Sequence, residues 1–250
     1  MNIRLSKKEI ERYSRQIILK NFSNIGQKKI KQAKILIIGV GGLGCSVAEF
    51  LTRAGAGLIG LVDDDKVSLS NLHRQSLFNE NDLGKLKVIC AKNKLNKING
   101  NTKLNTYKLR LNNLNAYKLI QKYDFIVDGS DNFKTKFLIN DFSLKLKKYL
   151  VVGAINKFDG HVLTYNFKIK KTPCLRCFFQ ENIVSDDILN CEYEGVLGTI
   201  ASIIGTLQAN EILKQILGIG KNLNNKILIL DLLNLKFRKA EIRKRKKCIC

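Results

Sequence analysis

The stretch KILIIGVGGLG, residues 34–44, decides the fold. Its first five residues form a largely apolar run, which is typical of a strand buried on both faces of a parallel sheet. Apolar residues then recur at helical spacing from residue 43 to residue 54. A strand, a tight turn and a helix in this order predict an α/β unit. The glycines of the turn are Gly39, Gly41, Gly42 and Gly44.

The glycine turn also predicts a binding site. Glycine lets the backbone approach a phosphate closely, and the N–H groups that open a helix favour a negative charge. Asp63 follows the next predicted strand, about 20 residues beyond the turn, where an acid can hold a ribose hydroxyl. The pattern therefore predicts a nucleotide site, and taken alone it is typical of NAD. A turn that needs glycine only for its geometry is the alternative.

Strands and helices continue to alternate along the chain. The further buried strands that we predict are at 58–62, 125–128 and 149–154, and the helices are at 6–19, 84–98 and 133–148. Alternating patterns predict antiparallel strands at 161–167, 227–231 and 235–242. We therefore predict a single α/β domain, residues 1–250, with a Rossmann-like, doubly wound, mostly parallel sheet and an antiparallel C-terminal extension.

Composition and charge limit the partners of the protein. At 250 residues and 45% hydrophobic, the chain can bury a sizeable core. It has no run of about 20 uncharged apolar residues and no secretory signal at its start, so we expect a soluble, cytoplasmic protein with no membrane partner. The net charge of +23 could favour the binding of nucleic acid, but the lysines are spread along the chain instead of gathered in one block. We therefore attribute the positive charge to drift in the amino-acid composition and not to selection for nucleic-acid binding.

Cations and one carboxylate follow the nucleotide pattern. Arg74 and Lys87 could clamp a triphosphate, which NAD lacks. Asp131 and Asn132 come just after the predicted strand at 125–128, at the sheet edge where open α/β sheets bind ligands. A carboxylate beside phosphate oxygens suits Mg²⁺. The alternative is that Asp131 caps the helix that begins at Phe133.

Seven cysteines in such a chain favour metal or thiol chemistry over disulfides. Cys45 and Cys90 lie within helical patterns, where we expect buried fillers. A C-x-x-C pair, Cys174 and Cys177, and a terminal C-x-C pair, Cys248 and Cys250, would together make a tetrahedral zinc site; a metal-free terminus is the alternative. Cys191 stands apart before a long helix, where it could act as a nucleophile, although its acidic neighbours oppose that role.

Taken together, these motifs resemble the bacterial E1-like adenylyltransferases of the ThiF/MoeB/HesA family. The resemblance extends over nearly the whole chain. Its motifs are RYSRQ at 12–16, the glycine turn, SNLHRQ at 70–75, DN at 131–132, CLRC at 174–177 and GTLQA at 205–209. It implies that the chain uses Mg-ATP to adenylate the C-terminal Gly-Gly carboxylate of a small ubiquitin-like sulfur-carrier protein, with release of pyrophosphate. A sulfur-donor protein would then supply sulfur for a thiocarboxylate.

The resemblance also implies the roles of single residues. Arg74 and Lys87 would engage the phosphates, Asp131 would bind Mg²⁺, and Arg15 would reach the ATP of the other subunit of a homodimer. Cys191 matches the cysteine of the sulfur-transfer step, and Cys174, Cys177, Cys248 and Cys250 would ligate zinc. Residues 1–155 would form the nucleotide-binding half, and residues 156–250 the carrier-binding and zinc half. The residues implied to bind the nucleotide are Gly39, Gly41, Gly42, Gly44, Asp63, Ser70, Asn71, Leu72, His73, Arg74, Lys87, Asp131 and Asn132.

Several functions remain open at this stage. We favour the thiamine branch of the family, and the molybdopterin branch, which uses the same chemistry on another carrier, is the alternative. An NAD-dependent oxidoreductase would leave Arg74, Lys87 and the cysteine pairs without a role. An E1-like enzyme that acts on tRNA is suggested by the charge of the chain.

Overall fold

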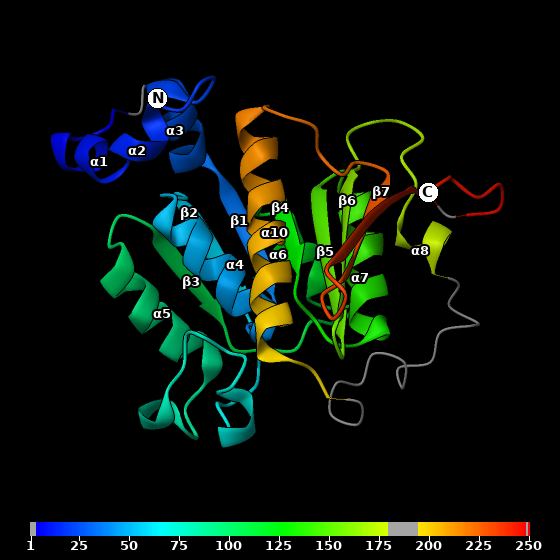
Figure 1. Cartoon of the computed structure of the whole chain (residues 1–250), viewed down its shortest axis with the longest axis horizontal. Helices are drawn as coiled ribbons and strands as arrows, with labels where there is room; N and C mark the ends of the chain where they lie inside the picture. The colour runs from blue at the N-terminus through cyan, green and yellow to red at the C-terminus, as the bar shows by residue number, and fades with distance from the viewer. Residues whose placement is uncertain (1–3, 180–194, 249) are drawn as a thin grey trace.

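Eight strands form one sheet in the order β3-β2-β1-β4-β5-β6-β7-β8 (Figure 1). The computed structural model describes residues 4–179, 195–248 and 250. The first five strands of the sequence are parallel, and β6, β7 and β8 are added antiparallel. The strands are β1 (Lys34–Ile38), β2 (Leu58–Val62), β3 (Lys103–Tyr107), β4 (Phe125–Asp128), β5 (Tyr149–Asn156), β6 (Asp159–Asn166), β7 (Lys226–Asp231) and β8 (Lys236–Glu241). This arrangement confirms the predicted fold class.

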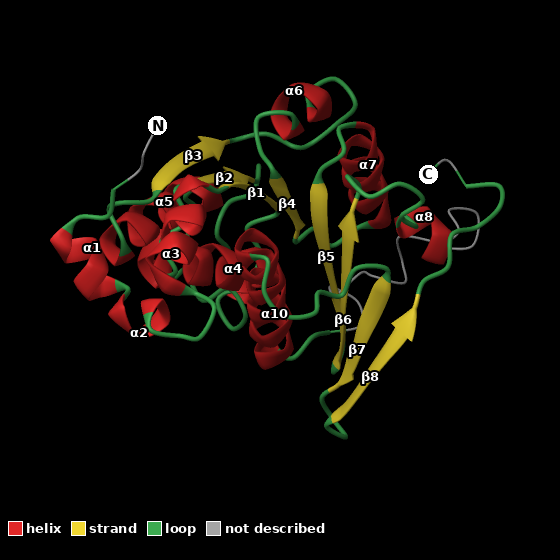
Figure 2. Ribbon diagram, turned by 90° about the horizontal axis from the view of Figure 1, so that it is seen from above, coloured by secondary structure: helices red, strands yellow, loops and turns green. Residues whose placement is uncertain are grey.

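Helices cover both faces of the parallel part of the sheet (Figure 2). One face carries α3 (Ser23–Gln32), α4 (Gly42–Arg53), α5 (Lys87–Ile98) and α10 (Gly198–Leu217), and the other carries α6 (Ala116–Ile120) and α7 (Phe133–Lys145). The remaining helices are α1 (Lys7–Arg12), α2 (Ser14–Ile17), α8 (Leu175–Phe178) and the short 3₁₀ turns η1 (Leu69–Asn71) and η2 (Glu80–Asp82). In the described part of the chain, no helix combines the length and the apolar character that a membrane crossing requires.

Strand β1 divides the core into its two layers. Ile35 and Ile37 point into the cluster formed with α4 and α10, whereas Leu36 and Ile38 point into the cluster formed with α6 and α7. All four side chains are at most 3% exposed, as a strand covered on both faces requires. The apolar run in the sequence is therefore a direct consequence of burial on both faces.

Two predicted helices differ from the structure, and the strand β3 is among the elements that were not predicted. The helix predicted at 6–19 is two helices, because the buried Tyr13 leaves helical geometry between α1 and α2 and accepts a hydrogen bond from Asn99 at its hydroxyl. The helix predicted from residue 84 begins at Lys87, since Gly84 has a φ of +76° and Leu86 is extended. The edge strand β3 was not predicted, because Leu104 is its one buried residue. The division into halves at residue 155 remains a prediction.

Gly39 and Gly44 of the glycine turn have no room for a side chain. Gly39 has a φ of +87°, in the left-handed region that favours glycine. A Cβ on Gly44 would lie 2.0 Å from the carbonyl oxygen of Gly39, so the first turn of α4 rests directly on the end of β1. This contact fixes the start of α4 against the sheet.

Gly44→Ala should therefore destabilise the fold by about 1–3 kcal/mol, because backbone rather than a mobile side chain blocks the added methyl group. Urea unfolding measures the change. Gly100→Ala is the matched control, since its new Cβ would have Asn96 O at 3.8 Å as its nearest neighbour. Equal unfolding midpoints for the two variants would contradict this account of the turn.

Candidate active site

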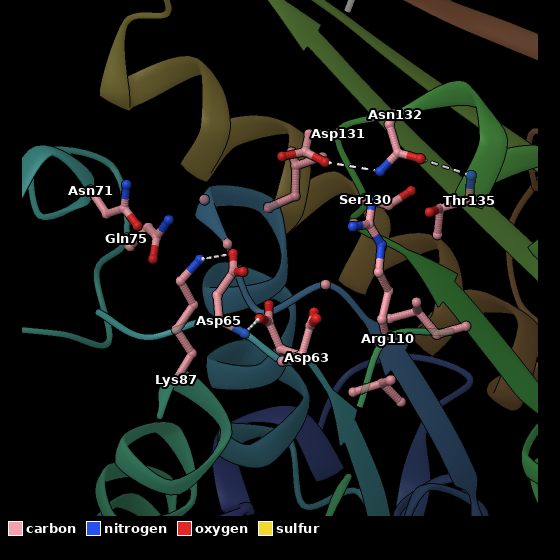
Figure 3. Close-up of a pocket in the computed structure, with 18 of the residues that line it drawn as sticks. Asp63, Asp65, Asn71, Gln75, Lys87, Arg110, Ser130, Asp131, Asn132 and Thr135 are labelled. Atoms are coloured by element: carbon pink, nitrogen blue, oxygen red, sulfur yellow. Dashed lines mark hydrogen bonds and ion pairs between the residues drawn. The ribbon is translucent and has the colours of Figure 1, made fainter. Parts of the chain in front are cut away.

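A cavity of about 590 Å³ lies at the carboxyl ends of the parallel strands (Figure 3). Strands β1 and β4 are neighbours there, although the chain goes from β1 to β2 and β3 on one side before it returns to β4 on the other. Such a change of direction separates the loops and opens a crevice at the sheet edge. Residues that follow each of β1 to β4 line the cavity, together with Ala154 and Ile155 of β5.

The glycine turn forms one wall of the cavity with Gly39, Gly41 and Gly42. Gly41 is the N-cap of α4, and no side chain of the described chain caps that end of the helix. The N–H groups of the first turn of a 12-residue helix thus point toward the cavity end of the sheet. This wall suits the phosphates or sugar of a nucleotide.

Asp63 lies directly after β2 and faces the same wall. Its carboxylate accepts hydrogen bonds from the backbone N–H groups of Val40 at 2.7 Å and of Asp65 at 2.8 Å. Burial raises the pKa of Asp63, against the lowering effects of the Lys87 charge and of the two N–H donors. A carboxylate in this position can accept hydrogen bonds from ribose hydroxyls.

Two cations line the cavity. The ammonium group of Lys87 is 2.8 Å from a carboxylate oxygen of Asp65, and Figure 3 shows the two side chains pointing toward each other. Lys87 is 5% exposed, whereas the side chain of Asp65 is 65% exposed. Arg74 donates to the carbonyl of Ser70 at 3.0 Å and contacts the ring of His73 at 2.7 Å. These cations are placed to bind an anion that enters the cavity.

The loop after β4 carries Asp131, the carboxylate that we predicted as the Mg²⁺ ligand. Asn132, not Asp131, is the N-cap of α7, because its side-chain oxygen accepts a hydrogen bond from the N–H of Thr135 at 2.9 Å. The alternative in which Asp131 caps the helix is therefore wrong. Asp131 is exposed and accepts from the amide of Asn132 at 3.2 Å, which leaves its carboxylate accessible to a cation.

Ten of the predicted nucleotide-binding residues line the cavity, and three do not. Those that line it are Gly39, Gly41, Gly42, Asp63, Ser70, Asn71, Arg74, Lys87, Asp131 and Asn132. Gly44 lies outside because it packs α4 on β1, and Leu72 because it packs against the core. His73 is exposed beside Arg74, and Arg15 is exposed on α2. Cys191 lies outside the described residues.

Several lining residues were not predicted. Arg110 and its neighbours follow β3, so missing that edge strand also hid them. Gln75 is 3% exposed, and its carbonyl oxygen has no partner within the described chain. Lys136 is 2% exposed on α7, where a lysine would ordinarily be assigned to the surface. The one feature of the sequence that could have indicated Lys136 is its position shortly after Asp131, near the start of the predicted helix. The other polar lining residues that were not predicted are Asp64, Asp65, Lys66, Ser68, Ser130 and Thr135.

The four paired cysteines meet outside the lining of the cavity. Their sulfurs lie within 4.8 Å of one another, with Cys174 and Cys248 at 3.5 Å and Cys177 and Cys250 at 3.4 Å. Four thiolates around zinc, each about 2.3 Å from the metal, are about 3.8 Å apart, so this donor set fits the ion. Burial raises the pKa of Cys174 and raises that of Cys250 to about 11, a cost that a bound cation would offset.

Arg176 fixes α8, the short helix that follows Cys174 and contains Cys177. It pairs with Asp141 of α7 at 2.8 Å, and the backbone of Leu175 donates to Asn140 at 2.9 Å. The two further cysteines in the described part of the chain are buried fillers, as predicted. Cys45 and Cys90 are buried, and burial raises the pKa of Cys45 to about 12.

Comparison with known proteins gives a consistent result. A sequence profile of the ThiF family matches residues 13–250. A sulfur carrier protein adenylyltransferase from Thermus thermophilus is 39% identical over 249 residues, which are 98% of this chain and 92% of that protein. The adenylyltransferase and sulfurtransferase MOCS3 of Xenopus laevis is 41% identical over 242 residues, which are 97% of this chain. The chain spans 53% of that relative, about half its length.

Solved structures show the same fold. Escherichia coli MccB with ATP superposes with a TM-score of 0.78 at 25% identity, covering 100% of this chain and 73% of that one. The same enzyme with MccA-N7isoASN gives a TM-score of 0.83 at 25% identity, covering 98% and 74% of the two chains.

Asp63→Asn should weaken the binding of a nonhydrolysable ATP analogue about tenfold, because the amide is a poorer acceptor for ribose hydroxyls than a carboxylate. Isothermal titration calorimetry measures this affinity. Unchanged affinity would exclude Asp63 from the nucleotide site.

The same variant tests the raised pKa of Asp63. A carboxyl group whose pKa is higher in the folded than in the unfolded state destabilises the fold above that pKa and is neutral below the unfolded value, about 3.9. The melting temperature of Asp63→Asn relative to wild type should therefore be higher at pH 7 than at pH 4. The opposite trend would contradict the effect of burial.

Proposed function

Since this chain belongs to the ThiF family, we propose that it adenylates the C-terminal Gly-Gly carboxylate of a small ubiquitin-like sulfur-carrier protein. The observation that carries the proposal is the cavity itself, where Arg74 and Lys87 line the same crevice as the carboxylate of Asp131. Cations and a metal-binding carboxylate around one crevice suit a triphosphate better than a hydride carrier. The oxidoreductase alternative does not use these groups.

The chemistry follows from the charges. An oxygen of the carrier carboxylate attacks the α-phosphorus of ATP and forms an O–P bond, while the bond from that phosphorus to the bridging oxygen of the β-phosphate breaks. Pyrophosphate leaves with the electron pair. The C-terminal carboxylate is already ionised at neutral pH, so no general base is needed. What the protein must supply is positioning, and cations that reduce repulsion between the two anions.

Each charged group has a role in this step. Lys87 and Arg74 would neutralise the phosphates, and Asp63 would hold the ribose. Asp131 would hold Mg²⁺, which would add positive charge at the leaving phosphates, and Asn132 would contact the nucleotide. The carboxylate of Asp65 that contacts Lys87 is largely solvated, so a phosphate can replace it at modest cost.

The finer assignments belong to the same proposal. We favour the thiamine branch, with the molybdopterin branch as the alternative, and we place the enzyme in the cytoplasm with a separate sulfur-donor protein. Arg15, exposed on α2, would reach the ATP of a second copy in a homodimer. Cys191 would take part in sulfur transfer after adenylation. Cys174, Cys177, Cys248 and Cys250 would hold a structural zinc ion, since a closed four-thiolate set leaves no position for substrate.

Arg74→Ala and Asp131→Ala should each reduce carrier-dependent ATP–pyrophosphate exchange at least about a hundredfold, since both groups act on the charge of the transition state. Exchange of labelled pyrophosphate with each purified carrier, thiamine and molybdopterin, measures the reaction and decides the branch. Arg53→Ala, on the outer end of α4 beside Glu49, is the matched control and should retain full exchange. Wild-type protein without exchange on either carrier would refute the proposed function.

Purified protein should contain about one zinc ion per chain, and the double variant Cys248→Ser/Cys250→Ser should lose it. Metal analysis of folded protein measures both contents. Cys45→Ser, a buried thiol outside the cluster, is the control and should keep the metal. Folded wild-type protein with less than about half a zinc ion per chain would contradict the site.

A further inference from the structure

Besides the Lys87–Asp65 pair, a second, buried ion pair lies next to the loop that carries Asp131. Asp128, the last residue of β4, is 0% exposed, and Lys136 of α7 is 2% exposed. The ammonium nitrogen of Lys136 lies 3.3 Å from a carboxylate oxygen of Asp128 and donates to the carbonyl oxygen of Gly153 on β5 at 2.7 Å. Lys136 lines the cavity, yet neither residue has a role in the mechanism above.

The second carboxylate oxygen of Asp128 holds the loop itself. It accepts hydrogen bonds from the backbone N–H of Ser130 at 2.9 Å and from its hydroxyl at 2.6 Å. The pair therefore joins the end of β4, the loop at 129–132, the first turns of α7 and β5. The amide of Gln208 on α10 also donates to the backbone carbonyl of Asp128 at 2.8 Å, which fixes the same point from the opposite face of the sheet.

Stability alone is a poor explanation for such a pair. Burying two charges costs desolvation that their attraction repays only in part, and well-packed apolar residues commonly stabilise a core as well. What a polar pair adds is geometry, because charge-assisted hydrogen bonds fix the positions of the groups that they join. Asp131 needs such support, since it is exposed and its own hydrogen bond is with the neighbouring Asn132.

We propose that Asp128 and Lys136 are positioning residues that hold the loop at 129–132, so that Asp131 and Asn132 face the nucleotide and its metal ion. This inference deepens the proposed function and rests on it. The pair touches neither substrate nor metal; it acts through the backbone of the loop. A pair that only stabilises the core would leave the loop and the metal-dependent affinity unchanged once the protein is folded.

The test removes both charges together, because either single change leaves a buried charge without a partner. Asp128→Asn/Lys136→Met should fold, with amide hydrogen exchange in the peptide covering 129–135 about tenfold faster than in wild type, as measured by mass spectrometry. Calorimetry should show affinity for a nonhydrolysable ATP analogue about tenfold weaker with Mg²⁺ present, and a smaller change without Mg²⁺. Both readouts work without a carrier, so failure of the carrier assay would not affect them.

The matched control is Asp82→Asn/Lys94→Met, which removes another ion pair, of 2.6 Å, whose residues lie outside the cavity lining. It should leave both readouts at wild-type values. If the Asp128 double variant does not fold, Ser130→Ala decides the question, because it removes the 2.6 Å hydrogen bond and leaves no charge unpaired. That variant should show the same two changes at about threefold. Wild-type exchange and wild-type metal-dependent affinity in the folded variant would overturn the proposal.

Discussion

The site depends on one topological constraint, the separation of the chain on either side of the neighbouring strands β1 and β4. Their connections leave toward opposite edges of the sheet, so no loop can cover the point between them. Several groups of the cavity directly follow the carboxyl ends of parallel strands. The glycine turn follows β1, Asp63 follows β2, and Asp131 follows β4. The cavity is therefore a consequence of strand order before any side chain is considered.

Two ion pairs border this cavity. They differ in how far their side chains are exposed to solvent, and we assign them different functions on that ground. Lys87 faces an Asp65 side chain that is 65% exposed, so water already competes for that carboxylate and a phosphate can take its place. The side chains of Lys136 and Asp128 are only 2% and 0% exposed, so water does not compete for this pair. Both pairs join a lysine to an aspartate. In the Lys87 pair the lysine is available to substrate, whereas in the Lys136 pair the two side chains fix the backbone of the loop at 129–132.

The sequence predicted the parts whose causes are local. The bounds of β1 and β2 follow from continuous apolar runs, and polar residues after such runs must lie at the sheet edge. Strand β3 was missed because an edge strand needs few buried residues, and Arg110 was missed with it. Lys136 could not be found from periodicity, since a lysine signals a surface unless a buried acid faces it. That acid, Asp128, lies eight residues away, and only the packing of α7 on the sheet brings the two together.

The cysteine cluster shows how the antiparallel extension is tied to the rest of the domain. Strands β7 and β8 form a hairpin at the far edge of the sheet, and Ile242, just after β8, is 5% exposed in the core that also holds Cys174 and Cys177. The chain then continues to Cys248 and Cys250, which pack against that same core. Since α8 is fixed on α7 by Arg176 and Asp141, the four sulfurs join the last strand to a helix of the parallel domain. A zinc ion bound there, as proposed, would bind the folded chain in preference to the unfolded one, and it would therefore stabilise the junction between the extension and the parallel part of the sheet.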